Sequence, residues 1–232
     1  MKNYLIIGAS SGIGKALALQ LAQANHTVTA TYNTHLPEAE TAGVQWHQLD
    51  ILQDNPDLSF IQTPIDGLVY CPGSINLKPF NRLNPADFLN DWQINFLGAV
   101  KVIQAVLPLL KQAGNASIVL FSTVAVGTGM PFHASISAAK AAVEALAKSL
   151  AAELAPAIRV NCIAPSLTNT ALAEKLLSTP EKTDASAKRH PLQRIGQPAE
   201  MAALAAFLLS ADAAFITGQV IHADGGLSAV KI

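Results

Sequence analysis

Short apolar runs rich in β-branched residues alternate along the whole chain with longer stretches rich in Ala and Leu. The short runs have the length of strands and the longer ones that of helices, so the pattern predicts βαβ units around a parallel sheet. The predicted strands are Asn3–Ile7, Thr27–Tyr32, Val44–Gln48, Gly67–Tyr70, Ala116–Phe121, Ile158–Ile163 and Val220–Ala223. The predicted helices are Ile13–Ala24, Pro85–Lys111, Ser135–Ala155 and Pro198–Ser210.

No repeat, low-complexity tract or linker interrupts this alternation, which predicts one domain over residues 1–232. The expected fold class is α/β: a Rossmann-like, doubly wound parallel sheet of about seven strands with helices on both faces. Pro108 should end or kink the second helix near Val106, because proline removes a backbone donor and clashes with the preceding turn. The stretch Leu167–His190, which holds Pro180 and many small or charged residues, is interpreted as a mobile insertion on the substrate side.

The composition and charge of the chain argue against binding to nucleic acid or a membrane, and they favour self-association. Charged residues are 13% of the chain, against a usual share of about 25%, and the net charge is −1. This charge leaves no electrostatic footprint for nucleic acid or an anionic membrane. Low charge with 50% hydrophobic residues favours a surface covered by further copies of the chain. We expect a homotetramer built partly from the helices Pro85–Lys111 and Ser135–Ala155.

Neither Cys71 nor Cys162 has the spacing of a zinc site or a disulfide framework, so both are expected to be reduced thiols, and no metal is expected. The apolar run Tyr4–Ile7 is too short for a signal-peptide core or a membrane span. These features predict a soluble, cytoplasmic protein without a membrane partner.

A glycine-rich turn follows the first predicted strand, with the sequence Gly8-Ala9-Ser10-Ser11-Gly12-Ile13-Gly14, and a helix begins directly after it. Such a turn lets the backbone approach a pyrophosphate, and the helix N-terminus offers unpaired N–H groups. The spacing differs from the G-x-G-x-x-G dinucleotide motif, and a tight turn without any ligand would also explain it. Its place in a strand–turn–helix unit at the start of an α/β chain favours a nucleotide.

Further segments of interest are Leu49-Asp50-Ile51, Tyr70-Cys71-Pro72-Gly73, Gln93-Ile94-Asn95, Ile163–Thr170, Thr217-Gly218-Gln219 and Ala223-Asp224-Gly225-Gly226. Together with the glycine turn, they resemble the short-chain dehydrogenase/reductase family as far as the C-terminus. The resemblance implies that Asp50 holds the adenine and that Asn95 is the family's structural or catalytic asparagine. Of the family's Asn-Asn-Ala-Gly only Gly73 remains. Residues 163–170 resemble its Pro-Gly-x-x-x-Thr segment beside the nicotinamide, with Ser166 in place of the glycine.

The same resemblance implies a nicotinamide cofactor. An acidic residue at the end of the second strand would bind the ribose hydroxyls and repel a 2′-phosphate. None is present there, and Asn33, Thr34 and Ser10 or Ser11 can donate to a phosphate, although Asn33 and Thr34 could also be ordinary turn residues. The sequence favours NADP(H) and leaves NAD(H) open. The expected cofactor-binding residues are Gly8, Ser10, Ser11, Gly12, Ile13, Gly14, Asn33, Thr34, Asp50, Ile51, Cys71, Gly73, Lys140, Pro165, Thr168 and Thr170.

The family's chemistry uses a Tyr four residues before a Lys on one helix, and a Ser thirteen residues before the Tyr. Lys140 matches the Lys, but the Tyr position holds Ile136 and the Ser position holds Thr123, with Ser122 beside it. Losing a positioned acid typically costs about 10²- to 10⁴-fold in rate. His133, seven residues before Lys140, would share a helix face with Ile136, Ser137 and Lys140 and is the nearest candidate to replace the phenol. The expected catalytic residues are Asn95, Ser122, Thr123, His133 and Lys140.

Each of these residues also has an ordinary structural interpretation. Lys140 could be a solvated lysine, Asn95 a buried asparagine bonded to backbone, Thr123 a strand-end residue bonded to its own backbone and His133 an exposed loop residue. The segment His133–Glu153 resembles dienoyl-CoA reductases, which lack the Tyr at this place, and enoyl reductases keep a Tyr seven residues before the Lys.

The leading interpretation is therefore an NAD(P)(H)-dependent oxidoreductase that transfers hydride to a carbonyl or conjugated enoyl substrate. The alternative is a catalytically silent nucleotide-binding protein, acting as a cofactor sensor or as one subunit of a mixed complex.

Overall fold

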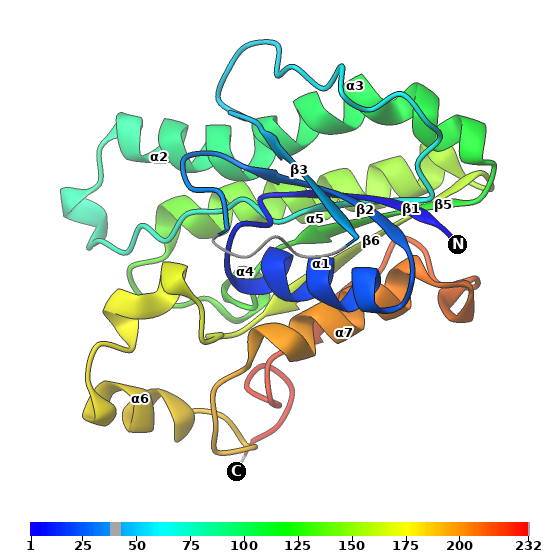
Figure 1. The fold of residues 1–232 in the computed structure, drawn as a ribbon. Coiled ribbons are helices and arrows are strands. Elements are labelled where there is room, and N and C mark those ends of the chain that lie inside the picture. Colours follow the sequence, from blue (N-terminus) through cyan, green and yellow to red (C-terminus); the bar gives the residue numbers. More distant parts are fainter. Residues whose placement is uncertain (38–42, 232) are drawn as a thin grey trace.

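A seven-stranded parallel sheet forms the centre of the computed structural model, which describes residues 1–37 and 43–231 (Figure 1). Its strand order is β3-β2-β1-β4-β5-β6-β7. From β1, the chain adds two strands on one side and then four on the other, which makes the sheet doubly wound and confirms the predicted fold class. The strands are β1 (Asn3–Ile7), β2 (Thr27–Tyr32), β3 (Val44–Gln48), β4 (Gly67–Tyr70), β5 (Ala116–Phe121), β6 (Ile158–Pro165) and β7 (Val220–Ala223).

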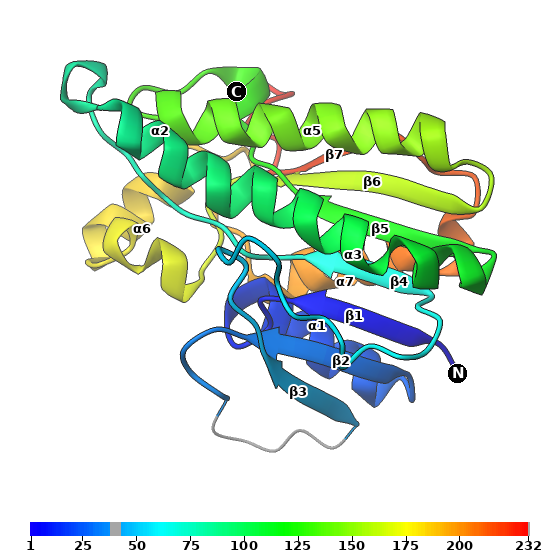
Figure 2. The ribbon, with the colours of Figure 1, turned by 90° about the horizontal axis from the view of Figure 1, so that it is seen from above.

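Helices cover both faces of this sheet. In Figures 1 and 2, α1 (Gly12–Gln23) and α7 (Pro198–Leu209) lie on one face, and α3 (Gly98–Ala113) and α5 (Ala134–Leu154) lie on the other. Successive strand residues supply the two apolar cores in turn: Leu5 packs on the side of α3 and α5, and Ile6 packs on the side of α1 and α7. The central strands β1, β4, β5 and β6 are buried on both faces and are mostly apolar. In β2 and β3, toward one edge of the sheet, apolar residues alternate with polar ones.

The predicted helix Pro85–Lys111 consists of three parts. α2 (Pro85–Trp92) leads into a π-helical turn, Gln93–Leu97, and α3 follows. Of the two effects expected from Pro108, an end or a kink near Val106, the end is wrong, since α3 continues to Ala113. Pro108 and the residue one turn before it, Gln104, both lie on the exposed face, where water can replace the missing backbone donor. The irregularity lies instead at Asn95, in the π-helical turn.

Residues 85–113 are also long and apolar enough to cross a membrane by length and composition, since an 18-residue stretch within them has a mean hydropathy of 1.5. However, α3 buries Val102, Val106 and Leu110 in the core beside the sheet. A core helix of a globular protein has the same composition, so burial accounts for the hydropathy of this segment.

The segment 167–190 contains regular structure that the sequence did not predict. A 3₁₀ helix, Ala171–Leu176, is followed by α6 (Pro180–Ala187). The Thr179 hydroxyl caps α6 by accepting the Lys182 N–H at 3.3 Å. Figures 1 and 2 show α6 beyond the carboxyl ends of the strands, where ligands bind in open α/β sheets. The mobility of this segment remains a prediction. The remaining short elements are Phe80–Arg82, α4 (Ala125–Thr128) and Ala211–Ala213.

Candidate active site

The glycine turn has the shape that a bound pyrophosphate requires. Gly8 and Gly12 have φ of +75° and +55°, a region that residues with a Cβ rarely adopt. A Cβ on Gly14 would overlap the Gly8 carbonyl oxygen and lie 2.9 Å from the Ala9 Cα. No side chain caps the N-terminus of α1, and no acidic residue lies in its first turn. The backbone N–H groups of this turn can therefore face an anion, so the residues present fit a dinucleotide.

The residues predicted for the adenosine half lie at the ends of the next two strands. Asn33 and Thr34 follow β2 and are exposed, and Asp50 follows β3. The Gln48 side chain donates to the Asn33 carbonyl at 2.9 Å, which links the ends of β2 and β3. One oxygen of Asp50 accepts the Leu52 N–H at 2.9 Å, and the carboxylate has a second oxygen for a ligand. The predicted Ile51 follows Asp50 in the chain, whereas Ser10 and Ser11 lie in the glycine turn after β1.

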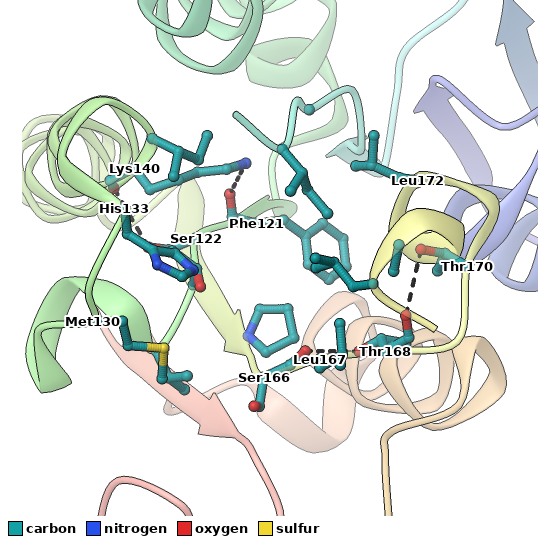
Figure 3. Close-up of a pocket in the computed structure, with 18 of the residues that line it drawn as sticks. Phe121, Ser122, Met130, His133, Lys140, Ser166, Leu167, Thr168, Thr170 and Leu172 are labelled. Atoms are coloured by element: carbon teal, nitrogen blue, oxygen red, sulfur yellow. Dashed lines mark hydrogen bonds between the residues drawn. The ribbon is translucent and has the colours of Figure 1, made fainter. Parts of the chain in front are cut away.

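A cavity of about 340 Å³ joins the glycine turn to the catalytic positions. Figure 3 shows Lys140, His133 and Met130 on one side of it and Thr170 and Leu172 on the other. A Cβ on Gly12 would stand 3.3 Å from Thr170, so the turn and the segment after β6 are in contact. No Asp or Glu of the described ranges is among the lining residues. The predicted site residues that line the cavity are Ile13, Cys71, Gly73, Ser122, Thr123, His133, Lys140, Pro165, Thr168 and Thr170.

Lys140 is a buried lysine at the cavity wall, so its interpretation as a solvated residue is wrong. Lys140 is only 9% exposed, and its ammonium donates to the Phe121 carbonyl at 2.8 Å (Figure 3). An ammonium has three N–H donors, which leaves further donors for a ligand. Burial lowers the pKa of Lys140 to about 8, and the nearby Asp91 carboxylate opposes this shift.

Ser122 and Thr123 differ in what their hydroxyl protons can do. The Ser122 hydroxyl donates to the Glu144 carboxylate at 2.6 Å, so its proton is already engaged. Thr123 instead accepts the Ala125 N–H at 3.3 Å, the local backbone bond expected of a strand-end residue. This bond leaves the Thr123 proton available to a substrate oxygen. Of the two predicted hydroxyls, Thr123 is the better oxyanion donor.

His133 is half-buried and lines the cavity, rather than standing in an exposed loop. It is the N-cap of α5, and its Nδ1 lies 2.7 Å from the Pro131 carbonyl oxygen. A carbonyl only accepts, so Nδ1 carries a proton and Nε2 is the nitrogen left for the cavity. Ile136 and Lys140 line the cavity on the following turns, whereas Ser137 does not. Tyr4, Tyr32 and Tyr70 all lie in strands, and none of them lines it.

Asn95 lies behind the residues that line the cavity, in a buried polar network that was not predicted from the sequence. Its Nδ2 donates to the Asp91 carbonyl and to the Ser74 hydroxyl, both at 2.8 Å, which confirms the expected backbone bond. Its Oδ1 is buried without a partner in the described structure. Ser74 and Ser135 both donate to the Asp91 carboxylate. The sequence feature that could have indicated this network is the spacing of four between Asp91 and Asn95, which places both residues on one helix face.

No group of three or more His, Cys, Asp or Glu side chains in the described part of the chain is placed to hold a metal ion.

A doubly wound parallel sheet whose first strand leads through a glycine turn into a helix, with a cavity at its carboxyl edge, is an α/β structure of the Rossmann type. Residues 8–228 match the family model described as enoyl-(acyl carrier protein) reductase. The chain belongs to the short-chain dehydrogenase/reductase family, whose homologous members are oxidoreductases.

Individual relatives match over nearly the whole chain. The 3-oxoacyl-[acyl-carrier-protein] reductase FabG of Thermotoga maritima is 36% identical over 244 residues, which cover 97% of each chain. The ligand-free aldohexose dehydrogenase of Thermoplasma acidophilum has a TM-score of 0.91 at 27% identity and covers 99% of this chain and 95% of its own. The structure of ElxO with NADP bound has a TM-score of 0.89 at 28% identity, with coverage of 98% and 99%.

Proposed function

We propose that the protein is an NADP(H)-dependent oxidoreductase that transfers hydride to a carbonyl or a conjugated enoyl substrate. The observation that carries this proposal is the single cavity that links Ile13 and Thr170, beside the glycine turn, to Thr123, His133 and Lys140. Cofactor and proton-handling groups thus border one space, as hydride transfer coupled to proton transfer requires.

In this proposal, the turn at residues 8–14 holds the pyrophosphate, Asp50 contacts the adenine and Lys140 donates to the nicotinamide ribose. Pro165 and Thr168 flank the nicotinamide, which supplies the hydride when the cofactor is bound. NADP(H) is favoured because residues 31–35, at the end of β2, include no carboxylate that would repel a 2′-phosphate. Asn33 and Thr34 are exposed there, and the Thr34 hydroxyl lies 2.7 Å from the His35 Nδ1. The NADP-bound ElxO neighbour gives further support.

The family's tyrosine position is held by Ile136 in this chain, and an isoleucine moves no proton. We infer that Thr123 donates a hydrogen bond to the developing oxyanion instead. Protonated His133 then gives its Nε2 proton to the reduced substrate and is left neutral, with Nδ1–H still bonded to Pro131. An enolate, formed when a conjugated double bond accepts hydride, needs this proton less urgently than an alkoxide does.

The cavity wall indicates what kind of substrate enters. Aliphatic side chains from three separate segments line it, and no carboxylate of the described residues does. Such a wall favours a substrate with an apolar body over a polyol or a cation. The aliphatic lining residues include Ile75, Leu77, Met130, Leu167, Leu172 and Leu176.

The decisive experiment is a panel of ketones, enones and enoyl thioesters, with oxidation of NADPH and of NADH followed by absorbance. The expected result is oxidation of NADPH with at least one class, faster than that of NADH. Cofactor binding by calorimetry without turnover of any substrate would instead support the silent nucleotide-binding protein. Binding of neither cofactor would refute the proposal as a whole.

We also propose that the chain assembles as a homotetramer. On α2, Leu89 is 59% exposed and Trp92 is 37% exposed, an apolar surface that another copy can cover. Light scattering at micromolar concentration should therefore report about four times the chain mass of 24.3 kDa. A particle of 24.3 kDa would contradict this.

A further inference from the structure

A buried carboxylate stands behind the cavity wall, on α2. Asp91 is 2% exposed, yet it forms no salt bridge with any described residue. Its Oδ1 accepts the Ser74 hydroxyl at 2.5 Å, and its Oδ2 accepts the Ser135 hydroxyl at 2.5 Å. Both oxygens thus act as acceptors, as those of an ionised carboxylate do. A charge at this depth is costly unless the surrounding groups compensate it, so its presence calls for a reason.

The bonds of Asp91 join three elements that build the site. Ser74 follows β4 and lines the cavity, and Ser135 lies in the first turn of α5, directly before Ile136. Ser74 also accepts from the Asn95 amide, whose Nδ2 donates in addition to the Asp91 carbonyl. Because both N–H donors of the Asn95 amide are engaged in these bonds, the orientation of the amide is fixed, and its Oδ1 points away from Asp91.

That oxygen faces the neighbourhood of the Lys140 ammonium. A Cβ placed on Gly73 would lie 3.3 Å from the Asn95 Oδ1 and 3.6 Å from the Lys140 Nζ, so both groups border one small space. Among the described residues, the Asn95 Oδ1 is a buried acceptor without a partner, and Lys140 has donors beyond the one given to Phe121. Asp91 therefore orders an acceptor that borders the same space as the Lys140 ammonium.

Few groups can set the charge of Lys140. The titratable groups of other elements near enough to act on its charge are Cys71, after β4, Cys162 of β6 and Asp91 of α2. On its own helix, His133 and Glu144 lie within two turns. Burial raises the pKa of both thiols to about 12, so they stay neutral near pH 8. Glu144 is bonded to Ser122. Asp91 is therefore the negative charge that other elements present to this lysine.

We propose that Asp91 is a positioning residue of the active site: its charge keeps the Lys140 ammonium protonated, and its bonds to Ser74 and Asn95 order the wall beside that ammonium. The inference rests on the proposed role of Lys140 in binding the cofactor. An ammonium donates to the ribose hydroxyls, whereas a neutral amine does so weakly. Asp91 thus extends the pH range in which the cofactor binds, without touching the cofactor itself.

The test is Asp91→Asn, which keeps the shape and removes the charge, with the NADPH dissociation constant measured by calorimetry from pH 6.5 to 9.5. In the wild type, binding should weaken as the pH rises through the titration of Lys140. In Asp91→Asn, this weakening should begin about half a pH unit or more lower, which corresponds to roughly twofold weaker binding near pH 8 and roughly threefold weaker binding near pH 9. At pH 6.5 the two proteins should bind NADPH alike.

The matched control is Asp87→Asn, one turn earlier on α2. Its carboxylate pairs with Lys78 and accepts the Asn84 N–H in the capping box of α2, so its loss should lower stability but leave the pH midpoint of binding in place. An unchanged midpoint in Asp91→Asn, or an equal shift in both variants, would overturn the proposal. Absence of NADPH binding by the wild type would refute the proposed function instead, so the two failures are distinguishable.

If Asp91→Asn does not fold, Ser74→Ala carries the test. This variant keeps the carboxylate but removes the hydroxyl that connects it to Asn95. The expected result is weaker NADPH binding to a similar degree at pH 6.5 and at pH 8.5, because the charge remains and only the positioning is lost. Unchanged binding at both pH values would contradict the positioning role.

Discussion

The two ends of the site are built from different parts of the chain. At the cofactor end, backbone shape within residues 8–14 decides what fits, and a single added Cβ on Gly14 would collide with the backbone of the same turn. At the cavity end, side chains from segments far apart in the sequence meet, among them His133, Thr123 and Leu172. The first end therefore resists substitution, whereas the second can change its chemistry residue by residue.

The largest effect is expected from Gly14→Ala. The Cβ must displace the Gly8 carbonyl or the start of α1, so backbone N–H groups no longer converge on the pyrophosphate. Losing two such charge-assisted bonds at about 1.5 kcal/mol or more each weakens NADPH binding by over about 100-fold. Calorimetry measures the affinity. The control is Gly127→Ala in α4, where the new Cβ would lie 3.7 Å from His222 in ordinary contact, and binding should not change.

At the cavity end, His133→Asn should lower turnover but leave cofactor affinity intact. The substitution removes the imidazole proton, and the loss of a general acid typically costs about 10²-fold or more. Turnover is measured on any substrate found active, together with NADPH affinity as a check on the fold. Unchanged turnover would remove His133 from the mechanism and leave a bound water as the proton source.

The complementary variant, Ile136→Tyr, restores a phenol one helical turn before Lys140. Activity toward simple ketones should rise, because the buried ammonium would lower the pKa of the new phenol and assist its proton transfer. The measurement is kcat/KM on ketones relative to enones for the two proteins. An equal or lower ratio in the variant would show that position 136 does not limit the chemistry.

The same contrast explains what the sequence could and could not predict. Strand and turn patterns are local, so all seven strands and the glycine turn could be predicted from apolar runs, from the alternation of apolar and polar residues in β2 and β3, and from glycine spacing. The sequence did not predict the π-helical turn at Gln93–Leu97, because no particular residue type signals such a turn. Proline does signal a helix interruption, but Pro108 lies on an exposed face of α3 and does not end it. Local sequence rules therefore predict the positions of the strands well, but they predict poorly the irregularities that depend on tertiary packing.

The polar network at the cavity end illustrates the second limit. Ser74, Asp91 and Ser135 are separated by 17 and 44 positions. The packing of α2 against α5 brings Asp91 to Ser135, and the segment after β4 brings Ser74 to Asp91. Likewise, the pairing of Ser122 with Glu144 across 22 positions distinguishes it from Thr123, its neighbour in the chain. A sequence motif gives the type of residue at a catalytic position, but it does not give the partner to which that residue's hydroxyl donates its proton.

A smaller effect at the cofactor end is expected from Asn33→Asp. The substitution is nearly isosteric and places a carboxylate at the end of β2, where it would repel a 2′-phosphate and accept from ribose hydroxyls. NADPH should bind about 10-fold more weakly, equivalent to about 1.4 kcal/mol, while NADH binding holds or improves. Calorimetry with both cofactors gives the ratio. An unaltered ratio would place the 2′-phosphate elsewhere.

The smallest effect is expected from Arg189→Gln, at the mouth of the cavity. Arg189 is exposed, and its guanidinium contacts the Met130 sulfur at 4.0 Å; no described carboxylate pairs with it. It is thus free to attract an anionic group on a substrate, but solvent screens it, and such exposed pairs contribute only about 0.2–1 kcal/mol. KM for a carboxylate-bearing substrate should rise by less than about fivefold, with no change for its neutral ester. The control is Arg194→Gln, whose guanidinium is already bonded to Glu200 at 2.6 and 2.8 Å and should not affect either KM. A large loss for both substrates in Arg189→Gln would mean that this end of the site is as intolerant as the glycine turn, and the contrast between the two ends would fail.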